Sequence, residues 1–518
     1  MKILPPKSVS LSSNWRDATL FNNGPRSRLI CLFVIFAFLS VIAFLSCGSG
    51  GGEGSGQSQG VTLNVDDYGA NPYDSNPDSM AIQACLDDAD NGDTVTFTSG
   101  VNSPNYQGYL IDQTLFLVAT AAKHDMIFTS TDPNNHALLK STDQLKGYVV
   151  RLFARSRVAD RGGIDHIMVS HLDIDGGRDV RRCFGSDGQS DGVDDNWGSW
   201  LPNECTDKGD SWCMAGSLAM DGEMDWTDAS QDYQGNPSSW STDLVVDDVS
   251  ITNTECGSAL SLGGADSIIQ NSSVQDAGDH THAAGCTRVD DDEGNGAWSD
   301  GITFSGPDHV VTNNRITNAS DVGIVFFGGH DTDITDNTIT CSPGNHGMFA
   351  GIAVHPWIFG NVSGVNVSGN QVQNNGDTTC GGIHAGINIG QHMWGGGCVT
   401  SANPAAVGNA SCSDDSAPSG TLCADGAICQ EWAHVAANRV FFLTNNSVTG
   451  AQINYLIEGL DLVGNLSESN NASQTPKVID WESAKVGCDG TAAWGPLDYV
   501  AHHPALQNWT DMVIHCER

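Results

Sequence analysis

Basic residues are scarce in this chain. The 518 residues include 22 lysines and arginines but 62 aspartates and glutamates, which gives a net charge of −40. Such an acidic surface repels the phosphates of nucleic acid and of anionic lipid, so the composition argues against both as partners. It suits a neutral substrate, salty surroundings or bound calcium. For any single carboxylate, the alternative is an ordinary solvated surface charge.

Long helical patterns are also rare, and no two cysteines have CxxC spacing. The 60 glycines and the short β-branched runs indicate a turn-rich all-β body. Without a CxxC pair, a cysteine zinc site is the weaker interpretation. Of the 16 cysteines, all but Cys31 and Cys47 fall in the part of the chain that we expect to be exported, and their even number favours disulfides that pin long loops.

The N-terminal part carries an export signal. The apolar run 29–46 follows Arg26 and Arg28 and ends at Cys47. The four residues ending at Cys47, FLSC, resemble the bacterial lipoprotein cleavage box. We expect a signal peptide over 1–46 and a lipidated Cys47 with a flexible tether over 47–60, so that only the lipid touches the membrane. The alternative is an uncleaved signal anchor. Both place the domain outside the cytoplasm, as a lipoprotein of the outer membrane or cell surface, or as a secreted protein.

A short pattern recurs along residues 61–518. The shortest spacing between successive copies is 23 residues. The six copies are 246–251, 269–274, 311–316, 334–339, 367–372 and 443–448. Four of them place an asparagine in one column, at Asn314, Asn337, Asn370 and Asn446. Stacked amides can bond to one another, and a period in the low twenties is typical of a parallel β-solenoid.

A second column consists of glycines. Gly301, Gly323, Gly351 and Gly386 each open a short apolar run, which predicts the next strand of each coil. Residues in equivalent places of successive coils should therefore be spatial neighbours.

The segment 61–118 gives the first specific family resemblance. A strand, a helix over 79–89 with Asp78 as its N-cap, and a second strand follow one another. This order resembles the N-terminal cap of the pectin-lyase-like superfamily, and implies a single-stranded right-handed parallel β-helix with a capping helix. We expect insertions at 179–240, 277–298 and 391–434, and a C-terminal cap from about 466.

Two aspartates beside the glycine column are candidate catalytic acids. Asp300 and Asp321 are 21 residues apart, about one coil, so we expect them on neighbouring strands. Glycoside hydrolysis needs such a pair, one carboxyl protonated and the other ionised. The alternative is that both are turn residues bonded to the backbone.

The same residues resemble the motifs of polygalacturonase-type hydrolases and of pectate-lyase-like proteins. Ser299-Asp300-Gly301-Ile302 matches the Asp-Gly-Ile coil of the hydrolases, whereas Val322 occupies the place of a second aspartate after Asp321. The Gly-His-Gly and Arg-x-Lys elements of that family are not evident. The resemblance implies a related architecture acting on a different sugar, and supports treating the two aspartates as a unit.

Further candidates line the same predicted groove. The third catalytic candidate is His384, and the substrate-binding candidates are His355, Trp357, Asn388, Trp298, Glu458 and His280. Glu458 is also an alternative acid. For the tryptophans, the alternative roles are core packing or loop anchoring.

The acidic runs at 187–195 and 290–293 could hold calcium, although neither has EF-hand spacing and both could be solvated loops. No cofactor is required. The leading interpretation is a glycoside hydrolase acting on a polysaccharide. The alternatives are a polysaccharide lyase, which the lack of an obvious Arg or Lys in the groove columns disfavours, and a non-catalytic carbohydrate-binding surface protein. The sugar, its linkage and the oligomeric state remain open.

Overall fold

The computed structural model describes residues 60–471 of the chain, with gaps. The gaps of five or more residues are 155–165, 181–215, 222–240, 279–298, 343–347, 376–382, 390–397, 409–439 and 458–465. All described residues belong to the second of two compact units, Ser58–Arg518.

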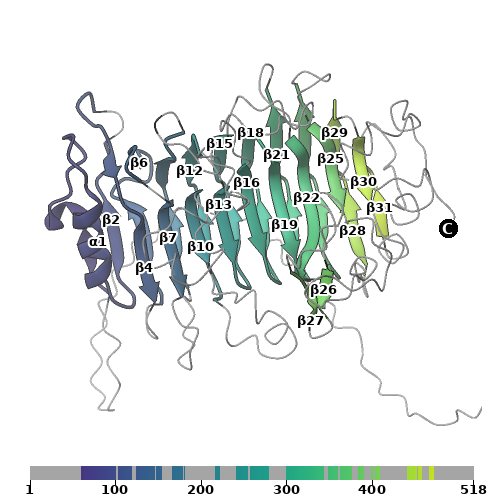
Figure 1. Ribbon diagram of the computed structural model, residues 1–518, viewed down its shortest axis with the longest axis horizontal. Coiled ribbons are helices and arrows are strands. Elements are labelled where there is room, and N and C mark those ends of the chain that lie inside the picture. The colour runs from purple at the N-terminus through teal and green to yellow at the C-terminus, as the bar shows by residue number, and fades with distance from the viewer. Residues whose placement is uncertain are drawn as a thin grey trace, which may run out of the picture. The chain divides into compact units, whose positions relative to one another are not determined.

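Three parallel sheets build this unit (Figure 1). The first sheet comprises β1 (Thr62–Asn64), β2 (Thr94–Phe97), β5 (Ile127–Ser130), β8 (Met168–Ser170), β11 (Val245–Asp247), β14 (Ile268–Gln270), β17 (Val310–Thr312), β20 (Asp333–Thr335), β23 (Asn366–Ser368), β28 (Phe441–Thr444) and β31 (Leu466–Ser469). The second comprises β3 (Tyr109–Ile111), β6 (Ala137–Ser141), β9 (Leu172–Asp175), β12 (Ser250–Thr252), β15 (Ser273–Ala277), β18 (Arg315–Ala319), β21 (Thr338–Cys341), β24 (Gln371–Asn374) and β29 (Ser447–Thr449). The third comprises β4 (Leu115–Ala119), β7 (Tyr148–Ala154), β10 (Gly216–Asp221), β13 (Gly257–Gly263), β16 (Ser299–Ser305), β19 (Val322–Gly328), β22 (Met348–Phe359), β25 (Ile383–Ile389) and β30 (Ile453–Ile457).

Each full coil contributes one strand to each sheet, and each strand pairs in parallel with the strand one coil further along. The predicted all-β parallel β-helix is therefore confirmed. β10 lies within the insertion predicted at 179–240, and β31 continues the first sheet past position 466. Two further strands, β26 (Cys398–Thr400) and β27 (Asn403–Gly408), form a separate antiparallel pair.

The core lies between the three sheets and repeats from coil to coil. Ile302 and Phe304 of β16 pair in register with Ile324 and Phe326 of β19, and all four side chains are at most 1% exposed. The rings of Phe304 and Phe326 stack with centroids 4.7 Å apart. Burying one such apolar ladder per coil provides the hydrophobic stabilisation of a solenoid.

The bends between the first and second sheets form a column of left-handed residues, which we call the bend column. Polar residues that tolerate positive φ fill it, because only asparagine, aspartate, histidine and glycine adopt this conformation readily. Its members with positive φ are His171, Asp248, Asn271, Asn313, Asp336, Gly369 and Asn445.

Beside the bend column runs the predicted asparagine ladder. The side-chain Nδ2 of Asn314 donates to Oδ1 of Asn337, Asn337 donates in the same way to Asn370, and Asn370 to Asn446, each at 3.0 Å. All four amides are at most 2% exposed. Asn446 donates onward to Asn471, a rung that the sequence pattern missed. The structure thus confirms the ladder and extends it.

The helix α1 (Ser79–Asp88) matches the predicted span and packs Ile82 into the core. Asp78 occupies its N-cap position, but the expected cap bond is absent among the described contacts. The Asp78 carboxylate instead accepts hydrogen bonds from the main-chain N–H groups of Asn71 and Leu110. The helix start is therefore tied to neighbouring segments rather than capped, while its role as a plug for the solenoid stays a prediction.

Cys85 does not take part in a disulfide of the kind that the cysteine count favours. It is a free thiol on α1, fully buried in the core. Burial raises the pKa of this thiol to about 11. Cys85 therefore acts as a small apolar core residue.

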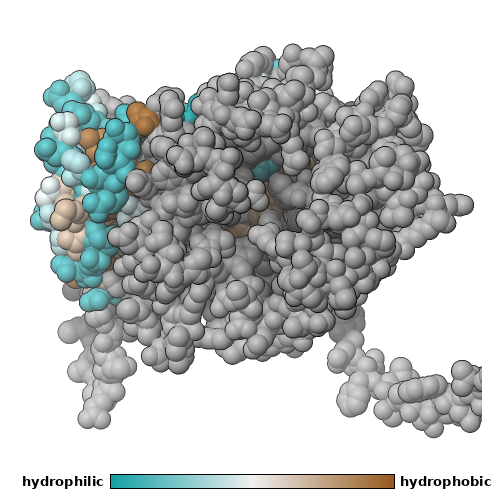
Figure 2. Space-filling view, viewed as in Figure 1, coloured by the Kyte–Doolittle hydropathy of each residue, from teal (hydrophilic) through white to brown (hydrophobic). Residues whose placement is uncertain are grey.

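The described surface that is visible in Figure 2 is mostly polar. In the space-filling view the coloured region is mostly hydrophilic, with small separate hydrophobic areas (Figure 2). Among the residues described, no helix is both long and apolar enough to span a membrane.

Candidate functional site

The site begins with Asp300, near the start of β16 on the third sheet. Its side chain is 9% exposed. Oδ2 accepts a hydrogen bond from Thr303 Oγ1 at 2.8 Å, and Oδ1 accepts one from the main-chain N–H of Val322 at 3.2 Å. Because Thr303 gives its proton to Asp300, Ser258 donates to the Thr303 oxygen at 2.6 Å. Three consecutive coils therefore hold this carboxyl in place.

The environment of Asp300 changes its acidity. Burial, which penalises the charged form, raises its pKa to about 7, while the hydrogen bonds from Thr303 and Val322 act in the opposite direction. A carboxyl with this pKa is partly protonated at neutral pH, so it can act as a general acid or a general base.

Asp321 is adjacent in the chain to Val322, whose N–H donates to Asp300. β16 and β19 pair Ile302 with Ile324, so the coil has 22 residues here, and Asp300 lies opposite Val322. The N–H of Asp321 donates to the carbonyl oxygen of Ser299 at 3.1 Å. Of the two aspartates expected on neighbouring strands, Asp300 lies in β16, whereas Asp321 lies one residue before β19. Asp321 precedes β19 in the bend and is 8% exposed.

A column of outward-facing residues crosses the third sheet next to Asp300; we call it the outer column. In the strand register this column passes through Thr303, and its residues on the coils to either side of Thr303 have small side chains. Its members are Phe116, Arg151, Ala219, Ser261, Thr303, Val325, Ala353, Asn388 and Leu456. Small residues occupy the middle of the column, where Ala219, Val325 and Ala353 are fully buried, and polar ones stand towards both ends.

Asn388 was predicted to bind substrate, and it lies on this column three coils beyond Thr303. Its amide is fully buried, yet neither Oδ1 nor Nδ2 makes a hydrogen bond to any described residue. An unbonded buried amide costs about 1–3 kcal/mol, so it is a candidate for contact with a ligand or an ordered water.

Arg151 is the residue that sequence reasoning missed. It lies on the outer column three coils before Thr303, is 8% exposed, and places its guanidinium 5.8 Å from the ring centre of Tyr148. The expectation that the groove columns hold no Arg or Lys is therefore wrong. Aligning the run YVVRLFA (148–154) with DGITFSG (300–306) would have revealed it, because that alignment places Arg151 on Thr303.

The other predicted site residues are only partly covered by the structure. His384 lies in β25, and His355 and Trp357 lie in β22, although their side chains are not among those described. Trp298, Glu458, His280 and Cys47 lie outside the described residues, as do both acidic runs proposed for calcium. Their roles stay predictions.

Comparison with known proteins finds similar solved structures but no family. No protein-family model matches the sequence, and no curated protein does. Among solved structures, the catalytic unit of a GH87 α-1,3-glucanase from Streptomyces thermodiastaticus strain HF3-3 is 12% identical, with 83% of this chain and 63% of that chain covered and a TM-score of 0.39. The present chain thus spans less than two thirds of the glucanase unit.

Two further matches have other printed roles. The surface adhesin PfbA of Streptococcus pneumoniae is 14% identical, with 81% of this chain and 90% of that chain covered and a TM-score of 0.38. An alginate lyase from Paenibacillus sp. str. FPU-7 is 13% identical, with 64% and 91% covered and a TM-score of 0.33. The three parallel sheets are those of a β-helix, which is the fold that the resemblance to the pectin-lyase-like superfamily implies.

Proposed function

We propose that this protein is a carbohydrate-active enzyme, a glycoside hydrolase that cleaves a polysaccharide on the outer face of its third sheet. The proposal rests on one observation: Asp300 is nearly buried and has its pKa raised to about 7. A carboxyl that keeps its proton near neutral pH can protonate the oxygen of a leaving sugar. β-Helix proteins that cleave glycans have a similar fold, in keeping with this class.

In the proposed mechanism, Asp300 is the general acid. It donates its proton to the glycosidic oxygen as the bond to the anomeric carbon breaks. Asp321 is the second carboxyl, which in its ionised form either activates a water molecule or attacks the anomeric carbon. After proton transfer, the bonds from Thr303 and Val322 stabilise the new Asp300 carboxylate.

A polysaccharide lyase is the second candidate, and Arg151 is the observation that favours it. A lyase abstracts the proton beside a uronate carboxyl and needs a cation to stabilise the resulting anion. Arg151 supplies a fixed cation on the outer column, but three coils separate it from Thr303, roughly 14 Å at the usual strand spacing. That span is too long for Arg151 and Asp300 to act on one sugar, so hydrolysis remains the leading proposal.

Product analysis tests the proposal. The purified full-length chain is incubated with a panel of neutral and uronic polysaccharides, and its Asp300→Asn variant is assayed in parallel. We expect new reducing ends without the ultraviolet absorbance of an unsaturated uronate, and a loss of turnover of about 10²–10⁴-fold in the variant. Asp333→Asn, which changes an aspartate on the first sheet, is the matched control and should keep full activity.

Three outcomes contradict the proposal in different ways. Unsaturated products would identify a lyase. Binding of a polysaccharide without any product would identify a carbohydrate-binding surface protein. Full activity of Asp300→Asn would remove Asp300 from the mechanism.

We also propose that the enzyme is exported and anchored through a lipid on Cys47. The motif FLSC supports this, and the acidic composition suits a polysaccharide partner better than a lipid surface. Metabolic labelling with a radioactive fatty acid tests it: the wild-type chain should be labelled and Cys47→Ala should not. Equal labelling of both would contradict the anchor.

A further inference from the structure

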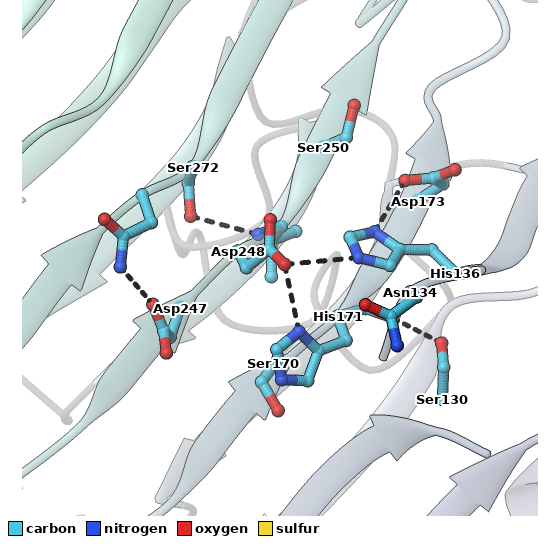
Figure 3. A network of polar contacts seen from close by, with 12 residues as sticks. Ser130, Asn134, His136, Ser170, His171, Asp173, Asp247, Asp248, Ser250 and Ser272 are labelled. Atoms are coloured by element: carbon cyan, nitrogen blue, oxygen red, sulfur yellow. Dashed lines mark hydrogen bonds and ion pairs between the residues drawn. The ribbon is translucent and has the colours of Figure 1, made fainter. Parts of the chain in front are cut away.

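A cluster of histidines and aspartates lies at the bends between the first and second sheets (Figure 3). His136 precedes β6, His171 precedes β9, and Asp248 precedes β12, so the three residues occupy equivalent places at the entry to three successive strands of the second sheet. His171 and Asp248 belong to the bend column, and His136 has the place before β6 that His171 has before β9. The solenoid thus stacks two imidazoles and a carboxylate in adjacent layers.

The atoms of the cluster converge on one point. Oδ2 of Asp248 lies 3.0 Å from Nδ1 of His171 and 3.3 Å from Nε2 of His136. These three atoms are all within 4.8 Å of one another. In a tetrahedral zinc site with bonds near 2.0–2.1 Å, two ligand atoms stand roughly 3.3 Å apart, so the spacing is close to what one ion requires.

The environment of His136 is difficult to explain with hydrogen bonds alone. Its Nδ1 lies 3.0 Å from Oδ1 of Asp173, and its Nε2 faces Oδ2 of Asp248. A neutral imidazole carries one proton, so one of its nitrogens would point a lone pair at a carboxylate oxygen. A cation between Nε2 and Asp248 removes this conflict, whether the cation is a second proton or a metal ion.

Asp173 completes the arrangement. If the Nδ1–H of His136 donates to Asp173, the lone pair of Nε2 is directed at Asp248 and the centre of the cluster. A carboxylate that orients a histidine through its other nitrogen is the usual outer partner of a metal ligand. The relevant side chains are 16% exposed for His136, 31% for His171 and 48% for Asp248, which leaves solvent access on one side.

We propose that His136, His171 and Asp248 bind one divalent transition-metal ion such as Zn²⁺, with Asp173 orienting His136. Two nitrogens and one carboxylate oxygen suit zinc and its neighbours, whereas calcium prefers six or more oxygens. Three protein ligands leave a fourth position open to water. The ion would link three consecutive coils on the second sheet, apart from the Asp300 carboxyl on the third.

A second cluster provides a comparison on the same chain. Asp308, His330 and Asp331 also lie close enough to share an ion. That group has only one histidine, both of its aspartates are exposed, and two of its members are adjacent in sequence. It serves as the control rather than as a second proposal.

The test uses the purified full-length chain, first stripped of metal with a chelator. Titration with Co²⁺, followed by visible absorption, reports nitrogen coordination, and calorimetry with Zn²⁺ gives the stoichiometry. We expect one ion per chain. His171→Asn and Asp248→Asn should each lose this ion. Asparagine tolerates the left-handed backbone at both places, where φ is 52° and 56°, so these variants should fold. Circular dichroism checks that they do.

Two further variants sharpen the result. Asp173→Asn should keep the site but weaken binding by about 10–100-fold, as expected for an outer partner. His330→Asn should bind as the wild type does. The proposal is overturned if the wild type binds no Co²⁺, in which case a proton bridges His136 and Asp248. It is equally overturned if His171→Asn and Asp248→Asn retain the wild-type spectrum and stoichiometry. Neither result depends on whether the chain cleaves a polysaccharide.

Discussion

The carboxyl of Asp300 accepts a hydrogen bond of 3.2 Å from the main-chain N–H of Val322, one coil further along the solenoid. This contact spans β16 and β19 and, with the bond from Thr303, fixes both oxygens of the carboxyl. A side chain held in this way keeps a defined position over the outer face of the sheet. The predictions below start from this contact and move outward.

Thr303→Val should move the pH profile of activity. The Thr303 hydroxyl stabilises the ionised form of Asp300 and therefore lowers its pKa, so its removal raises that pKa above about 7. If Asp300 is the general acid, activity falls as pH rises through this pKa. In the variant this fall should occur at a pH roughly 0.5–1 unit higher than in the wild type. Rate measurements from pH 5 to 9 check this. The same change at Thr335 on the first sheet should leave the profile unmoved.

Asp300→Asn should alter how stability depends on pH. The unfolded carboxyl has a pKa of 3.8, and burial raises the folded value to about 7. Between these values the folded state binds more protons than the unfolded state, so the free energy of unfolding falls as pH rises. The uncharged amide does not titrate and so avoids this loss. Between pH 4 and pH 8, the free energy of unfolding of the variant should therefore rise relative to that of the wild type by on the order of a few kcal/mol.

Denaturant unfolding at several pH values measures this gain. Asp333→Asn is the control, since its difference from the wild type should stay nearly constant over the same range. A constant difference for Asp300→Asn as well would mean that Asp300 has an ordinary pKa.

Asn337→Ala should weaken the solenoid. The Nδ2 of Asn337 donates to the Val311 carbonyl and to Asn370, and its Oδ1 accepts from two groups of Asn314. Removing the amide leaves buried groups on both neighbouring coils without their hydrogen-bond partners, at a cost of about 3 kcal/mol or more in the free energy of unfolding. Thermal unfolding should show a lower midpoint. Asn366→Ala, which loses one bond to Asp333 in a half-buried place, should change the midpoint little.

Asn388→Leu should separate binding from folding. The amide makes no hydrogen bond to any residue that the structure describes, so leucine of similar size should leave thermal stability unchanged or slightly higher. If the amide binds substrate, the variant should show a KM raised by about 10-fold with kcat less affected. A destabilised variant would indicate a structural bond instead, and an unchanged KM would remove Asn388 from the site.

The repeat could be predicted from the sequence because solenoid coils have equivalent positions. The asparagine column and the glycine column mark the same turn and the same strand start in each coil, so spacing alone identifies both. The spacing of Gly301 and Gly323 gives the same 22-residue coil as the strand pairing. What spacing could not fix was that the main-chain N–H of Val322, and not the side chain of Asp321, would contact the Asp300 carboxyl.

Two features could be recognised only from the structure, because they bring together residues that are distant in sequence. Arg151 and Asn388 stand three coils to either side of Thr303, and only the strand register connects segments so distant in sequence. The cluster of His136, His171 and Asp248 joins residues separated by a long insertion, since His171 and Asp248 are 77 positions apart. No local motif reports such a contact.

The amides of the asparagine ladder all point the same way. Each nitrogen reaches towards the later coil and each oxygen towards the earlier one, so their dipoles align along the solenoid axis. Successive asparagines at Asn314 and Asn337 are 23 residues apart, so residues 314–336 form one repeat whose asparagine donates to the asparagine of the next. Copies of this repeat inserted in tandem would lengthen the solenoid by one coil each, and the added asparagines would keep the same donor-to-acceptor direction.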